Sequence, residues 1–295
     1  MMFDAATLAT FVVNGLTTGC IYGLAAIGLC VIFNASGIVN FAQGSFVMFG
    51  GMVAADLFGR AGLPLAAAVL LATGLAWCLG WVLMQGVIRP LLARRAPILI
   101  LILATLALQI VLENAAMHAL GTKPLNLPEV TPGLMFRLGG IAVSGQNLWI
   151  ALGTLALVGL LWLFYTRTLM GKAMRACAVN REMASLLGIS VERTIALSFA
   201  ISAALGAAGG ILITPTQYTQ FNIALPYGIK AFVAAIIGGF GNVGGALVGG
   251  LILGVLESLA VAFVSSGYKD VIVFTLLLVI LVLRPSGLFG SPVED

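Results

Sequence analysis

The chain has 295 residues, of which 61% are hydrophobic and only 8% are charged, and its mean hydropathy is +1.15. Because a soluble globular domain carries about 25% charged residues, this composition excludes a soluble monomer. The net charge of +4 does not indicate nucleic acid binding, since basic residues in such a chain mark the loops that stay in the cytoplasm. We expect an all-α polytopic membrane protein, a single transmembrane domain with about eight to ten helical segments of roughly 20 apolar residues each.

The cysteines and the amino terminus add two expectations. Cys20, Cys30 and Cys78 lie in apolar runs and Cys177 lies in a polar stretch, a distribution that argues against a disulfide framework. The first residues carry no basic segment of the kind that opens a secretory signal. We therefore expect the first apolar run, residues 8–33, to be retained as a helix.

Small residues recur at every fourth position of this first run. Gly15, Gly19 and Gly23 share one helix face. A smooth face of this kind suits close backbone contact with another membrane helix.

A polar stretch at residues 34–45 interrupts the apolar sequence, and it has two interpretations. It is either a plain loop at one membrane face or a broken helix that faces the translocation pathway, because irregular backbone at membrane depth is tolerated only inside protein or beside a watery cavity. On the second interpretation, the pathway residues are Asn34, Ser36, Asn40, Gln43 and Ser45.

The distribution of arginine predicts the orientation. The span at residues 64–88 is followed by Arg89, Arg94 and Arg95, which mark the loop 89–95 as cytoplasmic. Residues 97–120 and 147–165 form the next two spans. The segment between them, residues 121–146, has strand-like apolar residues and is expected to be a small ordered external loop. Residues 166–193 then return to the cytoplasm, in agreement with the loop 89–95.

The long polar segment 166–193 holds five of the fourteen basic residues, namely Arg167, Lys172, Arg175, Arg181 and Arg193. Within it, residues 181–189 favour a short helix that Gly188 can end. A short helix in a polar loop has nothing of its own to bury against. We expect it to dock onto another protein.

The second half of the chain shows a second interruption. Residues 194–213 lead outward, and residues 214–226 form an external loop. From residue 229 to 264 the sequence is apolar except at 238–245, which has five glycines in eight positions. Glycine is unfavourable in a continuous helix, so we expect two helices joined by a tight turn, with Gly241 and Asn242 at the pathway. Paired interruptions at 34–45 and 238–245 indicate an internal inverted repeat. A turn at 267–270 precedes the last crossing, 271–283.

The sequence offers no catalytic set, so we expect no enzyme, cofactor or metal site. His118 has no Cys, Asp or second His at the spacing of metal ligands. The glycine string at 238–245 lacks the Gly-Lys-Ser/Thr of a phosphate-binding loop. The chain is therefore not expected to hydrolyse ATP by itself.

Two isolated glutamates, Glu113 and Glu257, lie inside apolar segments, and their roles are open. An intramembrane carboxylate is costly to bury and is either paired or functional. Structural pairing is one interpretation for each. The other is a self-contained ion-coupled secondary transporter or channel, which the broken helices and Glu113 would suit.

Several stretches resemble one family, the branched-chain amino-acid permeases of ABC importers, and its H-type subunit in particular. The stretches are GCIYGLAAIGL (19–29), NFAQG (40–44), MRACA (174–178), ASLLGI (184–189), GGFGNVGGA (238–246) and LRPSGLFG (283–290). Gln43 stands where relatives often have histidine, and Ser45 where an acidic residue is common. These departures widen the expected solutes beyond leucine, isoleucine and valine to amides, urea and related small solutes.

The resemblance implies a set of partners. They are a second, M-type permease, two cytoplasmic ATP-binding subunits and an extracytoplasmic solute-binding protein, assembled in a bacterial inner membrane. It also implies that residues 166–193 are the cytoplasmic coupling loop, in which small residues seat in an ATPase groove and charged ones contact its rim. The expected docking residues are Arg175, Arg181, Glu182, Ala184, Ser185, Leu187 and Gly188.

Overall fold

The computed structural model describes residues 5–138, 141–284 and 286–290, and it is a helical bundle with one small hairpin. Within these residues, eight helical stretches are long and apolar enough to cross a membrane, which confirms the predicted all-α polytopic fold. In chain order the elements are α1 (Ala5–Ser36), α2 (Gln43–Gly59), α3 (Leu65–Leu83), a π-helical turn (Met84–Ile88), α4 (Arg89–Ala93), α5 (Ile98–Leu120), β1 (Met135–Leu138), β2 (Ile141–Ser144), α6 (Gly145–Arg167), α7 (Leu169–Val179), α8 (Arg181–Leu186), α9 (Val191–Ile213), α10 (Ala224–Gly238), α11 (Val243–Phe263) and α12 (Lys269–Leu283).

The interior of the bundle is built on α1, α2 and α9. Helix α1 packs against α9, α10 and α11, while α9 also contacts α2 and α3. Helices α3, α5, α6 and α12 leave large apolar side chains exposed, among them Leu70, Ile110, Leu160 and Val282. An apolar surface of this extent suits lipid or another membrane subunit.

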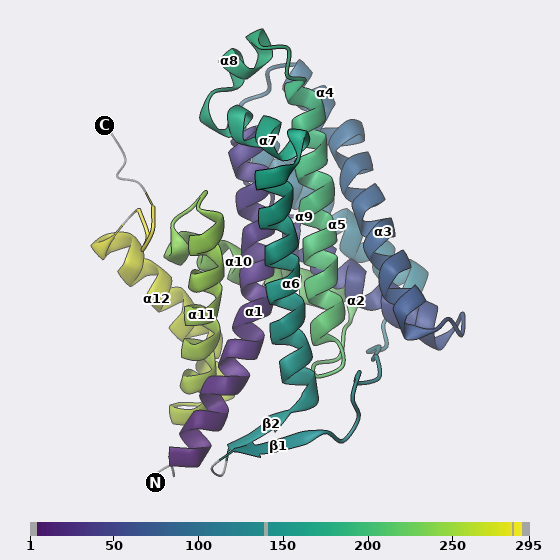
Figure 1. Ribbon diagram of the computed structural model, residues 1–295, viewed down its shortest axis with the longest axis vertical. Coiled ribbons are helices and arrows are strands. Elements are labelled where there is room, and N and C mark those ends of the chain that lie inside the picture. Colours follow the sequence, from purple (N-terminus) through teal and green to yellow (C-terminus); the bar gives the residue numbers. More distant parts are fainter. Residues whose placement is uncertain (1–4, 139–140, 285, 291–295) are drawn as a thin grey trace.

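The two ends of the bundle differ (Figure 1). Helices α4, α7 and α8 lie at one end, whereas the β1–β2 hairpin and the first described residues of α1 lie at the other. The arginine-rich residues 89–95 and the polar segment 166–193 therefore share an end. Strands β1 and β2 pair antiparallel, with Phe136 opposite Val143, which confirms the ordered loop expected at 121–146.

Glycines bring α1 and α11 into backbone contact. A Cβ atom at Gly250 would overlap the backbone of Gly23, and one at Gly254 would overlap the carbonyl oxygen of Gly15 and the backbone of Gly19. No side chain fits between the two helices at these points. The predicted small face of the first apolar run is thus confirmed, and α11 is its partner.

Residues 37–42 separate α1 from α2, and they run from one end of the bundle into its interior. Gly37 lies beside the guanidinium group of Arg181 at the α8 end. Gln43, the first residue of α2, lies beside Gly28 of α1 and Ser202 near the middle of α9. The chain therefore breaks between two helices inside protein, where irregular backbone can be satisfied.

The turn between α10 and α11 is covered by the last described residues. The amide of Leu288 donates to the carbonyl of Ile237 at 2.9 Å, and the amide of Phe289 donates to the carbonyl of Gly238 at 3.1 Å. Asn242 Nδ2 donates in turn to the carbonyl of Phe289 at 3.0 Å. The glycine-rich turn and the carboxyl-terminal motif thus form one packed unit.

Two sequence predictions about loops are wrong. The sequence predicts an external loop over 214–226, but a 3₁₀ turn (Phe221–Ile223) leads into α10, which begins at Ala224. Pro226 falls in the first turn of α10, where a missing backbone N–H breaks no helical hydrogen bond. The segment 166–193 is not a loop with one short helix, since α7 precedes α8 and α8 ends at Leu186.

Candidate functional site

Side-chain caps define the bend between α7 and α8. Thr168 Oγ1 accepts a hydrogen bond from the amide of Gly171 at 2.9 Å and opens α7. Asn180 Oδ1 accepts one from the amide of Met183 at 3.0 Å and opens α8. Each cap satisfies an amide that the first helical turn leaves unpaired. Asn180 also ends α7, so one residue fixes both helices.

Gly188 ends α8 in the manner predicted from the sequence. Its φ is +80°, a conformation that favours glycine. The amide of Ile189 donates to the carbonyl of Ala184 at 3.0 Å, and the amide of Gly188 donates to that of Ser185, also at 3.0 Å. This pair of bonds is the Schellman motif, which satisfies carbonyls that the end of a helix leaves unpaired.

Helices α7 and α8 differ in how they pack on the bundle. Helix α7 buries Gly171, Met174 and Cys177 on one face, whereas α8 buries only Ala184. The end of α7, α8 and the residue after α8 carry large apolar side chains that are 55% to 89% exposed. We call this group the α8 surface: Val179, Met183, Leu186 and Leu187.

The structure sorts the predicted docking residues into two sets. Ala184 is only 2% exposed and packs against its own chain, so its side chain does not belong to the α8 surface. The others are exposed at the same end of the bundle: Arg175, Arg181, Glu182, Ser185, Leu187 and Gly188.

The two interruptions of the sequence meet at this end of the bundle. Asn34 Nδ2 donates to the carbonyl of Gly241 at 2.7 Å. The ring of Phe33 lies edge-on to that of Phe240, with centroids 4.6 Å apart. Asn242 accepts a hydrogen bond from the amide of Gly245 at 2.9 Å and caps α11.

The remaining residues predicted for a pathway are buried, and among them Gln43 makes a polar contact with another helix. Ser202 Oγ of α9 donates to Gln43 Oε1 at 2.6 Å, and Gln43 Nε2 donates back to the carbonyl of Ser202 at 3.3 Å. Ser36 Oγ donates to the carbonyl of Ile32, Asn40 Oδ1 accepts from the amide of Ala42, and Ser45 is fully buried. A role for these residues in translocation stays a prediction.

Glu257 is paired within the chain, in agreement with the structural interpretation of its role. Lys230 Nζ of α10 lies 2.6 Å from Glu257 Oε1, and the hydroxyl of Tyr22 donates to Glu257 Oε2 at 2.8 Å. Lys230 also pairs with Asp270 at 3.1 Å, and Lys269 lies 3.9 Å from Glu257. We call these five residues the ion-pair cluster: Tyr22, Lys230, Glu257, Lys269 and Asp270.

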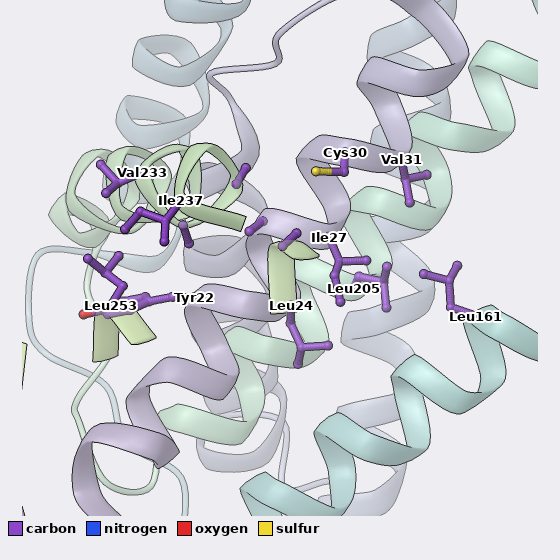
Figure 2. Close-up of a cluster of buried hydrophobic side chains, with 14 of the residues drawn as sticks. Tyr22, Leu24, Ile27, Cys30, Val31, Leu161, Leu205, Val233, Ile237 and Leu253 are labelled. Carbon is purple, nitrogen blue, oxygen red and sulfur yellow. The ribbon is translucent and has the colours of Figure 1, made fainter. Parts of the chain in front are cut away.

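Figure 2 shows the direction in which the side chain of Tyr22 leaves α1. The ring of Tyr22 points away from Leu24 and Leu161 toward Leu253, and its hydroxyl oxygen lies at the far edge of the hydrophobic cluster. Sequence reasoning missed Lys230, although a single lysine in an otherwise apolar helix is itself the signal of a paired intramembrane charge.

Glu113 and His118 of α5 contribute no comparable site. Within the part of the chain that the structure describes, neither residue takes part in an ion pair, and no group of three metal-ligating side chains is found. Gln109, one turn before Glu113, is buried, whereas Glu113 itself is partly exposed.

The comparisons with known proteins agree with this architecture. A family model described as "Branched-chain amino acid transport system / permease component" matches residues 11–281. The high-affinity branched-chain amino acid transport system permease protein BraD of Pseudomonas aeruginosa is 36% identical, over 95% of each chain. The corresponding protein LivH of Escherichia coli is 35% identical, over 95% of this chain and 94% of the relative.

A solved structure supports the fold alone. PsaBC from Streptococcus pneumoniae, in complex with Fab, superimposes with a TM-score of 0.50 at 12% identity, covering 92% of this chain and 91% of that chain. The match of the family model over most of the chain and the identity to curated relatives lead to one conclusion. The chain belongs to the family of permease components of branched-chain amino acid transport systems.

Proposed function

We propose that the chain is the H-type permease subunit of an ATP-binding-cassette importer for branched-chain amino acids, and that it forms half of the translocation pathway with an M-type permease. Its other partners are two cytoplasmic ATP-binding subunits and an extracytoplasmic solute-binding protein. The transport systems for which the relatives are named support the solute class, and they favour an importer over a self-contained ion-coupled transporter. On this proposal the energy is supplied by partner subunits.

The exposed α8 surface is the observation that carries the docking part of this proposal. Leu186 and Leu187 are 81% and 78% exposed at the tip of the bundle, on a helix that buries only Ala184 in its own chain. Large apolar side chains held outside the membrane-spanning helices indicate a protein partner. Exposed Arg175, Arg181 and Glu182 supply charged groups for the rim of such a contact.

The charge distribution supports a cytoplasmic position for this end. Eight of the fourteen basic residues are exposed in the two segments at the α8 end, namely Arg89, Arg94, Arg95, Arg167, Lys172, Arg175, Arg181 and Arg193. Lysine and arginine are retained on the cytoplasmic side of bacterial membranes. The hairpin and the start of α1 would then face the outside of an inner membrane.

The geometry suggests how motion at α8 would reach the spans. Asn180 links α8 rigidly to α7, and α7 buries Met174 in the same cluster as Tyr22 and Leu24 of α1. On its other side α8 leads through Gly188 into α9. Closure of the ATP-binding subunits would therefore displace α7 and α9 together.

A charge placed on the α8 surface tests the docking. We expect Leu186→Glu with Leu187→Glu to reduce co-purification of the ATP-binding subunits and ATP-driven leucine uptake by tenfold or more, because each buried leucine contributes about 1.5–3 kcal/mol. Val130→Glu, a similar change at an exposed valine near the opposite end, is the matched control. Wild-type binding of the ATP-binding subunits by the double variant, inserted at normal levels, would contradict the docking role. The same uptake assay with amides and urea tests the wider solute range.

A further inference from the structure

A cavity of about 320 Å³ lies beside the ion-pair cluster. Its lining includes Asn14, Thr18 and Gln217, which also line a neighbouring cavity of about 400 Å³ next to the hairpin. Tyr22, Lys230 and Glu257 line the same cavity, and Tyr22 lies near the middle of α1. The cavity therefore reaches from the hairpin end of the bundle to charged groups inside it, and its size is within the usual range of ligand sites.

The lining of this cavity combines two kinds of surface. Lys230 and Glu257 are each only 7% exposed and present a cation and an anion that are held 2.6 Å apart. Ser258 and Lys269 add further polar lining, and an apolar part of the wall comes from Phe11, Pro226, Tyr227, Gly254 and Val261. A ligand that matches both surfaces carries a positive and a negative charge close together and a small apolar body.

We infer that this cavity binds the zwitterion of an amino acid with a small apolar side chain, with its carboxylate on Lys230 and its ammonium group on Glu257. The inference rests on the proposed function and adds to it a solute site within the permease itself. It concerns the interior of one chain, between α1, α10 and α11, and is separate from the α8 surface.

The ion pair explains how such a site can stand empty at low cost. A buried charge without a partner is strongly destabilising, and Lys230 and Glu257 neutralise one another when no ligand is present. A zwitterion that enters between them supplies one new partner to each, so the number of paired charges is maintained. Tyr22 holds Glu257 Oε2 at 2.8 Å and keeps the carboxylate oriented during the exchange.

Two residues at the rim of the cluster can stabilise Lys230 and Glu257 when these two charges separate. Asp270 lies 3.1 Å from Lys230, and Lys269 lies 3.9 Å from Glu257, and both side chains are about half exposed. These two residues begin α12 and offer each buried charge a second partner of the right sign. Exchange therefore requires rotation of side chains and leaves the packing of α1 on α11 intact.

The first test uses the wild-type permease pair with its ATP-binding subunits, purified without the solute-binding protein. We expect leucine to raise its thermal midpoint, and we expect neither leucinamide, which lacks the carboxylate, nor 2-hydroxy-4-methylpentanoate, which lacks the ammonium group, to do so. An equal shift with either analogue, or no shift with leucine, would overturn the zwitterion site. This measurement does not depend on the folding of any variant.

The second test separates a ligand site from a structural ion pair. Replacing both charges, Lys230→Met with Glu257→Met, is often neutral for stability when a buried pair has only a structural role. A ligand site predicts instead that ATP-driven leucine uptake by the complete transporter falls by about tenfold or more, because two charge-assisted contacts are lost, and that the leucine-induced shift disappears. The matched control removes a more exposed ion pair, in which Arg60 is exposed and Asp56 is partly buried (Asp56→Asn with Arg60→Met).

The outcomes distinguish this inference from the proposed function. Uptake and a leucine-induced shift at wild-type levels in the double methionine variant would overturn the site and leave the importer proposal standing. A wild-type transporter that takes up no branched-chain amino acid would overturn both. Lys230→Arg, which retains the charge, is expected to keep more uptake than Lys230→Met, whereas equal uptake by the two variants would contradict a role for the cation.

Discussion

Asn34 Nδ2 donates a 2.7 Å hydrogen bond to the carbonyl oxygen of Gly241, across 207 positions of sequence. Asn34 lies in the last turns of α1, and Gly241 lies in the turn between α10 and α11. The bond joins the two polar interruptions that stand out in an otherwise apolar chain. It fixes the end of α1 to the turn that the carboxyl-terminal residues cover.

This bond predicts a loss of stability when its donor side chain is removed or when the turn that carries its acceptor is strained. We expect Asn34→Ala to lower the thermal midpoint in detergent, because a hydrogen bond contributes about 0.5–1.5 kcal/mol. Gly241→Ala should cost more, since its φ is +93° and a Cβ would approach Asn34 Oδ1 to 3.0 Å. The control is Asn114→Ala, whose side chain bonds only to the carbonyl of Ile110 one turn earlier. Equal midpoints for Asn34→Ala and Asn114→Ala would contradict the tie between the interruptions.

Glycine-to-alanine substitutions should change the stability of the protein in opposite directions at two kinds of position. A Cβ at Gly250 would overlap the backbone of Gly23, so Gly250→Ala must separate α1 from α11. We expect little folded protein, as measured by gel filtration after mild solubilisation. A Cβ at Gly159, in α6, would meet nothing within 4 Å, and Gly159→Ala should stabilise by up to about 1 kcal/mol. A well-folded Gly250→Ala protein would show that the glycine contact between α1 and α11 tolerates side chains.

Gln43 and Ser202 should show coupled effects. Gln43→Leu leaves the buried hydroxyl of Ser202 without its partner, and we expect a loss of about 1–3 kcal/mol. Ser202→Ala alone leaves the amide of Gln43 short of one bond. The double variant should be more stable than the sum of the two single losses predicts, because no polar group is then left unpaired. Additive shifts of the thermal midpoint would count against the contact.

Substitutions of Gly188 test whether ATP-driven uptake depends on the positive φ of the residue that ends α8. Asparagine tolerates positive φ better than a β-branched residue does, so Gly188→Asn should keep most ATP-driven uptake and Gly188→Val should lose it. In the single chain nothing lies within 4 Å of a Cβ at this position, so the strain of φ +80° is the expected cause. If Asn and Val variants lose uptake equally while the ATP-binding subunits no longer co-purify, close seating in the partner is the better explanation.

Local patterns in the sequence predicted much of the fold. The four-residue spacing of glycine predicted the face of α1, the arginines predicted which loops share an end, and the glycine string predicted the turn before α11. Each of these signals is contained within one helix or loop. The sequence also predicted that Gly188 ends the short helix, because the need for positive φ is a local property.

Contacts between distant segments could not be predicted in the same way. Periodicity says that Gly15 and Gly19 need a close neighbour, but it does not say that α11 is that neighbour. The sequence could not name the partner of Glu257 because Lys230 lies in another helix. It could not predict that Ala184 is buried, because that burial depends on tertiary packing. Helix α7 was missed because its basic residues resemble those of an ordinary polar loop.

The glycine contact between α1 and α11 also limits how the permease can move. Two helices in backbone contact at Gly15, Gly19 and Gly23 cannot rotate or tilt against one another without collision. They form a single stiff element, and it carries Tyr22 and Glu257 on the same body. Any change of shape that a partner drives at α8 must therefore be taken up around this element, by α7, by α9 and by the six-residue break before α2.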